Sequence, residues 1–317
     1  MSELVLIFPA PTAAARAALA QPLGRARESA LPGGDWRSWL ARRLGAAALA
    51  TQPPAQVAAA AAGLVPADAW FATPVALIAA LDHVRMPADG WLMLTADEGA
   101  RLAANFARGF DGSGVSLLPA GAEGFLLSGL AAPAARTHDP AGLLGADIGP
   151  WLASGEGAAA VRRLGAEIEL WLHGHPVNRA RAQRGCAPVA TLWLWGGGAP
   201  PAKAAQAAPV HPGGPVARLY GGDSWLRGVW RAAGRELAGD AQAMAQVCVA
   251  GDADTIVVAR HGIDEGIVER WCGPALAQLA GRRIRRVRFV LDGRQFRCAR
   301  FDLVKPWRRT VSWAMPA

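Results

Sequence analysis

Lysine and tyrosine are almost absent from this chain of 317 residues. It contains 2 lysines against 31 arginines, and 1 tyrosine against 13 tryptophans. Together with the many alanines, this indicates a compositional bias of the genome, so part of the arginine count has no functional meaning. Arginine content by itself therefore does not predict a nucleic-acid-binding protein.

Cysteine is also scarce, and its spacing excludes two common kinds of site. No two of the four cysteines form a CxxC pair, so neither a zinc ribbon nor a thioredoxin-type redox site is predicted. The four residues are Cys186, Cys248, Cys272 and Cys298. We expect them to be reduced thiols in a cytoplasmic protein.

Long apolar segments are missing as well. The apolar run near the N-terminus, Leu4 to Phe8, is too short for a secretory signal. The longest stretch without charge, Leu44 to Ala67, is interrupted by Pro53-Pro54 and by polar residues, so we do not expect it to span a membrane.

The composition that remains is that of a globular protein, with 52% hydrophobic and 18% charged residues. The length allows two ordinary domains or one large one. The net charge of +8 is concentrated at one end: residues 282–309 carry 11 basic and 2 acidic side chains, against 22 and 23 elsewhere. This confines any contact with nucleic acid to residues 282–309, and the near-neutral remainder disfavours a general nucleic-acid-binding role.

Apolar runs alternate with helical patterns, which predicts an α/β fold. Strands are predicted at 4–8, 115–118, 124–130, 189–195 and 255–259. Helices are predicted over most of 12–62, from Thr95 with Glu98 in capping-box spacing, and over 157–173, 223–238 and 264–280. Residues 199–215, rich in alanine, proline and glycine, are predicted to form a loop.

Asp292-Gly293 predicts a tight hairpin between strands 284–291 and 294–301. The implied register sets Arg288 opposite Arg297. Like charges in that position are unfavourable unless they are solvated or bridged by an anion.

The segment from Glu167 to Gly198 is the richest in groups that could carry chemistry. Histidine, amide and guanidinium groups beside a glycine-rich turn suit a phosphate or carboxylate, since arginine forms charge-assisted bonds with both oxygens of such an anion. The candidate ligand-binding residues are His173, His175, Asn178, Arg179, Arg181, Trp195 and Gly196.

Other interpretations of the same segment stay open. The histidines could cap a helix end, the arginines could form internal salt bridges, and Trp193 and Trp195 could simply pack in a core. Glu169, His173 and His175 form part of a metal-ligand set, but no third strong ligand lies nearby in sequence. Thr137-His138-Asp139 is a weak candidate for a nucleophile and base.

Two motifs carry a resemblance to known proteins: Leu172-His-Gly-His-Pro-Val-Asn-Arg-Ala-Arg181 and Pro188-Val-Ala-Thr-Leu-Trp-Leu-Trp-Gly-Gly-Gly198. They resemble bacterial regulatory proteins of RpfE type, which are grouped with the cofactor-independent phosphoglycerate mutases. The resemblance extends to the archaeal-type 2,3-bisphosphoglycerate-independent phosphoglycerate mutases of the alkaline-phosphatase superfamily, and it covers roughly residues 90–310.

This resemblance implies an alkaline-phosphatase-like mixed sheet flanked by helices, with a smaller inserted α/β domain. The core would then be discontinuous, over residues 1–88 and 187–317, and the inserted domain would cover residues 89–186. It also implies a serine that carries the phosphoryl group and two divalent ions, such as Mn or Zn, held by Asp and His residues.

The sequence departs from that implied site at each metal position. Pro9-Ala10-Pro11 stands where a metal-binding Asp is expected, Ile267 replaces a His after Asp264, and Gly293 replaces a His after Asp292. Glycine and isoleucine side chains offer a metal no lone pair. Asp264 and Asp292 are therefore interpreted as vestigial metal positions, and no cofactor is expected.

The sequence-based hypothesis is a degenerate phosphoglycerate-mutase-like protein, non-catalytic and regulatory or ligand-sensing. It would bind a small phosphorylated or carboxylated ligand through the His/Asn/Arg residues named above. An active mutase or other phosphoryl-transfer enzyme with an altered site is the first alternative. An interaction protein that uses the basic hairpin 282–309 is the second. Neither the ligand nor the oligomeric state follows from the sequence.

Overall fold

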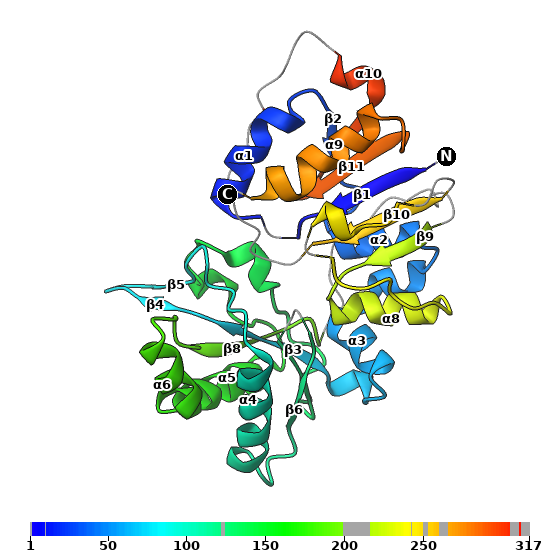
Figure 1. The fold of residues 1–317 in the computed structure, drawn as a ribbon. Coiled ribbons are helices and arrows are strands. Elements are labelled where there is room, and N and C mark those ends of the chain that lie inside the picture. The colour runs from blue at the N-terminus through cyan, green and yellow to red at the C-terminus, as the bar shows by residue number, and fades with distance from the viewer. Residues whose placement is uncertain are drawn as a thin grey trace. The chain divides into compact units, whose positions relative to one another are not determined.

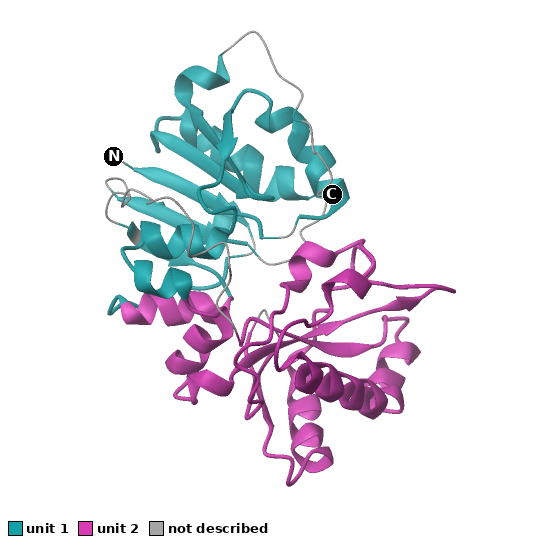
Figure 2. Cartoon of the chain, turned by 180° about the vertical axis from the view of Figure 1, so that it is seen from behind, with its two compact units in different colours: residues 1–51, 202–222, 233–317 teal, residues 52–201, 223–232 magenta. Residues whose placement is uncertain are grey.

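The computed structural model describes residues 2–9, 11–121, 124–198, 216–241, 243–249, 253–259, 266–304 and 311. The chain divides into two compact units, which Figure 2 shows in different colours. Unit 1 comprises residues 1–51, 202–222 and 233–317, and unit 2 comprises residues 52–201 and 223–232. Each unit has a sheet and a hydrophobic core of its own.

The described part of unit 1 is built on a six-stranded sheet, visible in Figure 1. In spatial order its strands are β2 (Arg27–Ala30), β12 (Arg294–Ala299), β11 (Arg286–Leu291), β1 (Glu3–Ile7), β10 (Asp254–Val258) and β9 (Val216–Tyr220). Strands β9, β10, β1 and β11 run parallel, whereas β12 is antiparallel to both of its neighbours. The sheet is therefore mixed, and flanking helices complete the predicted α/β class.

Helices α1 and α9 cover one face of this sheet, and α2 covers the other (Figure 1). The helical elements of unit 1 are α1 (Ala13–Leu23), α2 (Trp36–Arg43), η1 (Ala47–Thr51), η5 (Met244–Gln246), η6 (Val268–Cys272), α9 (Gly273–Ala280) and α10 (Arg300–Leu303). Alternation along β1 explains the division. Leu4 and Leu6 enter the core shared with α1 and α9, while Glu3 points to the other face, toward α2.

A buried charge network, which sequence analysis did not predict, lies on that second face. The Glu3 carboxylate is 2.7 Å from the Arg43 guanidinium and 3.0 Å from that of Arg288. Arg43 also lies 2.5 Å from Asp254. Both arginines stack over the Trp39 ring, at 5.5 and 5.6 Å from its centroid. Charges removed from water are tolerated only when they are paired in this way.

The hairpin at Asp292-Gly293 forms as predicted, with positive φ angles of 49° and 68° at the two turn residues. The predicted register is also confirmed, since Arg288 lies opposite Arg297. Glu3 of the adjacent strand is the anion that compensates Arg288.

The described part of unit 2 has a four-stranded antiparallel sheet in the order β6 (Ser116–Pro119), β7 (Phe125–Ser128), β3 (Trp70–Val75) and β8 (Thr191–Trp195). A short hairpin, β4 (Ile78–Ala79) with β5 (Val84–Arg85), forms a separate ladder. The helical elements are α3 (Pro54–Ala61), η2 (Pro66–Asp68), α4 (Ala96–Gly109), η3 (Pro140–Leu143), η4 (Gly149–Trp151), α5 (Ala158–His173), α6 (Pro176–Gln183) and α8 (Ser224–Ala232).

Apolar residues of α4 and α5 close the core of unit 2. Leu102 and Phe106 of α4 pack with Leu164 and Ile168 of α5. The Thr95 capping box is present, and α5 covers nearly the predicted range. Strands β1, β6, β7, β8 and β10 likewise match the predicted strands.

Two features differ from the sequence-based expectations. Within residues 12–62, predicted to be mostly helical, β2 is a strand because it pairs with β12. Helix α8 ends at Ala232, six residues before the predicted end. The predicted loop 199–215 lies outside the described residues.

The compact units divide the chain elsewhere than at the expected boundaries of 88/89 and 186/187. Residues 52–88 and 187–201 belong to the same unit as 89–186. The reason is strand pairing, because β3 lies between β7 and β8 in one sheet. Residues 223–232 also belong to unit 2. There α8 packs so closely on α3 that a Cβ at Gly228 would lie 2.6 Å from the Val57 carbonyl oxygen.

Among the described residues, no helix combines the length and the apolar character needed to span a bilayer. The four cysteines are free thiols; Cys272 and Cys298 are buried, and the other two are exposed.

The buried charge network predicts a large loss of stability on replacing Arg43 with Met. The change keeps most of the side-chain volume but leaves the buried Asp254 without its cation and Glu3 with Arg288 alone, so unfolding free energy should fall by about 3–5 kcal/mol. Urea denaturation measures this. Arg101→Met, which breaks an exposed pair with Asp97, is the control and should cost at most about 1 kcal/mol. Equal effects of the two variants would contradict a structural role for the network.

Candidate functional site

The candidate ligand-binding residues begin at the corner between α5 and α6. Helix α5 ends at His173, Gly174 follows it, and His175 caps the N-terminus of α6. Pro176 occupies the first helical position, where the missing N–H costs nothing. His173 is exposed and His175 is buried. The turn between α5 and α6 therefore gives the two histidines different surroundings, although they are only two residues apart in sequence.

The ring of His175 is held on both sides. Its Nδ1 accepts a hydrogen bond from the backbone N–H of Val177 at 3.2 Å, and its Nε2 lies 3.0 Å from the side-chain amide nitrogen of Asn105. The Trp171 ring packs against it with centroids 4.7 Å apart. Burial, with a smaller contribution from the nearby charge of Arg179, lowers the pKa of His175 below its ordinary 6.5.

Asn178 and Arg179 both bond to the backbone. The Asn178 side chain donates to the carbonyl oxygens of Leu172 and Val189, each at 2.9 Å, and accepts from the N–H of Val189 at 2.8 Å. It thereby ties the end of α5 to the segment that leads into β8. Arg179 donates to the Gly174 carbonyl oxygen at 3.0 Å. These are helix-end and loop contacts.

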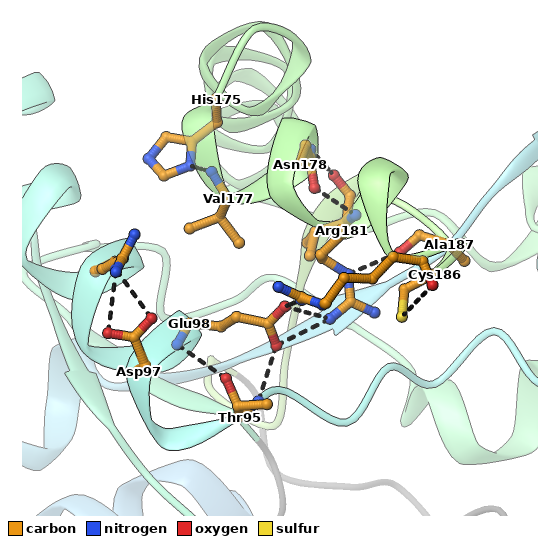
Figure 3. Close-up of polar contacts among 12 residues, drawn as sticks. Thr95, Asp97, Glu98, His175, Val177, Asn178, Arg181, Cys186 and Ala187 are labelled. Atoms are coloured by element: carbon orange, nitrogen blue, oxygen red, sulfur yellow. Dashed lines mark hydrogen bonds and ion pairs between the residues drawn. The ribbon is translucent and has the colours of Figure 1, made fainter.

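Arg181 is buried and paired with Glu98 of the capping box (Figure 3). Its Nη1 lies 3.1 and 3.0 Å from the two carboxylate oxygens of Glu98, while its Nε donates to the Ala187 carbonyl oxygen at 2.7 Å. Arg184 approaches the same carboxylate from the surface. The protein's own Glu98 therefore occupies the place that the sequence assigns to a bound anion.

Several groups act on the pKa of Glu98. Burial raises it, but the backbone hydrogen bond from Thr95 and the charges and hydrogen bonds of Arg181 and Arg184 outweigh burial and leave it below its ordinary 4.5. Glu98 is thus a carboxylate that the fold keeps ionised.

Trp195 and Gly196 lie at the end of β8, away from these pairs. The Trp195 indole N–H donates to the Thr73 hydroxyl at 2.8 Å, and its ring packs on Phe71. Gly196, with φ of 72°, donates to the Thr137 hydroxyl and accepts from the Ala55 N–H at 2.8 Å. Both residues support the sheet.

The Thr137-His138-Asp139 triplet hydrogen-bonds to residues in and just after β8 and caps η3. Besides the Thr137 contact, the His138 carbonyl oxygen accepts the Trp193 indole N–H at 2.9 Å, and the Asp139 side chain caps η3. Burial lowers the pKa of His138.

The two aspartates that the sequence analysis interprets as vestigial metal positions have different outcomes. Asp292 forms a bidentate pair with Arg16 of α1, at 2.7 and 3.1 Å. Asp264 lies outside the described residues. Within the residues that are described, no three His, Cys, Asp or Glu side chains gather as a metal site. Of the two aspartates, Asp292 is the one that the structure describes, and its carboxylate is already bound to the guanidinium of Arg16.

A scan against protein-family models and a search of the curated proteins found no match. The search of solved structures found matches of low similarity. One is the cofactor-independent phosphoglycerate mutase from Thermoplasma acidophilum DSM 1728, with 14% identity, a TM-score of 0.35, and coverage of 93% of this chain and 89% of that one. Another is the PH0037 protein from Pyrococcus horikoshii, with 12% identity, a TM-score of 0.43, and coverage of 94% and 87%.

The structure does not gather the predicted ligand-binding residues around one point. Asn178 and Arg181 belong to α6 and His175 caps its N-terminus, yet each has a separate partner within the protein (Figure 3). Sequence analysis missed Glu98 as the partner of Arg181. Its capping-box position placed it at the start of α4, but nothing in the sequence linked it to a residue 83 positions away.

We predict that Glu98→Gln lowers the unfolding free energy at pH 7 by about 3 kcal/mol, because Arg181 would stay buried without its counter-charge. The folded-state pKa of Glu98 is depressed, so the ionised form stabilises the fold above the unfolded-state pKa, and this contribution disappears as pH falls through the lower, folded-state pKa. The difference from wild type should therefore shrink below about pH 4.5. Urea titrations at several pH values measure it, with Asp97→Asn on the same turn as the control.

A second prediction concerns His175. Its folded-state pKa is lowered, so the unfolded chain binds a proton more readily and stability falls as pH drops from about 6.5. His175→Asn keeps a good N-cap residue and removes this titration. The variant should lose less stability than wild type between pH 7 and pH 5, although His138 adds a similar dependence in both proteins. Parallel pH profiles would contradict the assignment.

Proposed function

We propose that the chain is a non-catalytic relative of the phosphoglycerate mutases with a ligand-sensing, regulatory role. One observation carries the proposal. Asp292 is paired with Arg16, and Arg181 is paired with Glu98, so both of these charges of the implied site already have an opposite charge within the protein. A regulatory role is also what the RpfE-type resemblance of the sequence implies.

At Asp292, a divalent ion would have to displace Arg16 or bind beside its positive charge. The guanidinium holds both carboxylate oxygens, which are the atoms a metal would use. Pro9 and Gly293 offer no side-chain donor nearby in sequence. The residues present therefore do not fit the two-metal group, and no catalytic step through metal ions is derived for this chain.

At Arg181, a phosphate would have to displace Glu98, which is only 4% exposed. The displaced carboxylate would then be buried without a partner, at a cost of several kcal/mol. We infer that the His/Asn/Arg residues stabilise unit 2. The sequence-based hypothesis has a phosphorylated or carboxylated ligand bound there; because Arg181 already holds Glu98, we expect the experiment below to detect no such binding.

The basic hairpin supports an interaction role less well. Arg288 pairs with Glu3, and Arg294 pairs with Glu28 on β2. Two of its positive charges are thus compensated within the sheet.

The proposal predicts that the purified protein contains no stoichiometric Mn or Zn and does not interconvert 2- and 3-phosphoglycerate. Elemental analysis and a coupled mutase assay with added Mn measure this. Neither phosphoglycerate should raise the melting temperature, whereas a ligand at 100 times its Kd would stabilise the fold by about 2.7 kcal/mol. Arg16→Ala, which frees Asp292, should not restore metal-dependent turnover. Stoichiometric metal together with turnover would establish the active-enzyme alternative instead.

A further inference from the structure

Unit 2 contains a cavity that none of the predicted site residues lines. It has a volume of about 430 Å³ and is bounded by α5, β8, the β4–β5 hairpin and the loop around η4. That volume is within the range of about 300–1,000 Å³ typical of small-molecule sites. The cavity is therefore large enough for a compact organic ligand.

The wall of this cavity is mostly apolar. Val161 on α5, Leu192 and Trp193 on β8, and Ile148 and Leu152 beside η4 supply much of it. Small residues on α5 leave the space open. At Gly165 an added Cβ would meet no atom within 4 Å, and Ala166 follows it along the wall. An apolar ligand body would gain from leaving water here.

The charged groups of the wall are mainly acidic. Glu169, Asp82 and Asp147 face Arg162 and His83. Arg162 donates to the neutral Ala153 carbonyl oxygen at 2.5 Å and so keeps its positive charge, whereas His83 lies 2.6 Å from Asp82; three carboxylates still outnumber one guanidinium. This excess of negative charge in the wall disfavours a carboxylated or phosphorylated ligand and favours a cation.

Glu169 is the carboxylate best placed to hold that cation. Asp147 accepts the backbone N–H of Gly149 and Asp82 is paired with His83, whereas the contact described for Glu169 is the Thr191 hydroxyl. Glu169 is an exposed residue of α5 that hydrogen-bonds to Thr191 of β8 and lines the cavity. An ammonium group beside Glu169 would let an attached apolar body lie along Trp193 and Leu192.

We propose that this cavity binds a small molecule with an apolar body and an ammonium group, and that Glu169 pairs with the ammonium. The proposal deepens the ligand-sensing role proposed above by naming a site and a ligand class. It depends on neither the phosphoglycerate resemblance nor the mutase assay, so the two can fail separately.

The charge of Glu169 also sets the expected pH dependence. Partial burial raises its pKa above the ordinary 4.5, and the hydrogen bond from Thr191 opposes that rise. A cation binds the ionised form, so affinity should fall as pH drops through this raised pKa. Asp82, His83, Asp147 and Arg162 are the other charged or ionisable groups of the same wall, and His173 lies one turn along α5. Comparison with Glu169→Gln therefore isolates the contribution of Glu169.

The test uses three probes that share one apolar body: phenethylamine, phenethyl alcohol and hydrocinnamate. Binding to the full chain is measured by ligand-observed NMR and calorimetry. The amine should bind at least about tenfold more tightly than the alcohol, and the carboxylate should bind most weakly. No measurable amine binding at millimolar concentration, or equal affinity for amine and alcohol, would overturn the proposal.

Two variants locate the site. Gly165→Leu fills the cavity from α5 and favours the helix, so it should abolish binding of the amine while the melting temperature stays the same or rises. Glu169→Gln should weaken amine binding by about tenfold and remove its dependence on pH, with little effect on the alcohol.

Glu167→Gln is the matched control, since Glu167 lies on the same helix but pairs with Arg163 outside the cavity. It should bind the amine as wild type does. Undiminished binding in Gly165→Leu would place the ligand elsewhere. An equal loss of amine affinity in the Glu167 and Glu169 variants would show that the effect comes from the overall surface charge of the helix. Either result would overturn the assignment.

Discussion

Pairing between arginines and the protein's own buried carboxylates is the interaction on which both units depend. In unit 1, Glu3 lies between Arg43 and Arg288 on the sheet face covered by α2. In unit 2, Glu98 binds Arg181 and links the start of α4 to α6. A buried carboxylate or guanidinium left without a partner would cost several kcal/mol, so losing one partner of either pair should destabilise the unit that contains it.

The same constraint limits what the chain can bind. A guanidinium that already holds a carboxylate with two bonds has little left for an external anion, and a carboxylate so held is a poor metal ligand. The residues that the sequence suggests for ligand binding therefore stabilise the fold. The cavity of unit 2 differs in kind, because it combines an apolar wall with a carboxylate that no described cation neutralises.

Residues whose partners are close in sequence were predicted well. The capping box at Thr95 and Glu98, the turn at Asp292-Gly293 and the opposition of Arg288 and Arg297 all depend on local spacing and were confirmed. The grouping of β3 with β7 and β8, which decides the compact units, depends on contacts between distant segments. Strand β2 was missed for the same reason, since only its pairing with β12 makes it a strand.

The sequence by itself determined the α/β class, the principal strands and helices, and the concentration of basic residues toward the C-terminal end. Periodicity and turn chemistry act over a few residues, and these features are local. Only the tertiary structure decided which charges meet. Glu98 and Arg181 are 83 residues apart, and Glu3 and Arg288 are 285 apart. A local sequence pattern cannot show pairs separated by so many residues. Only the folded structure therefore shows whether an arginine already pairs with a carboxylate of the protein.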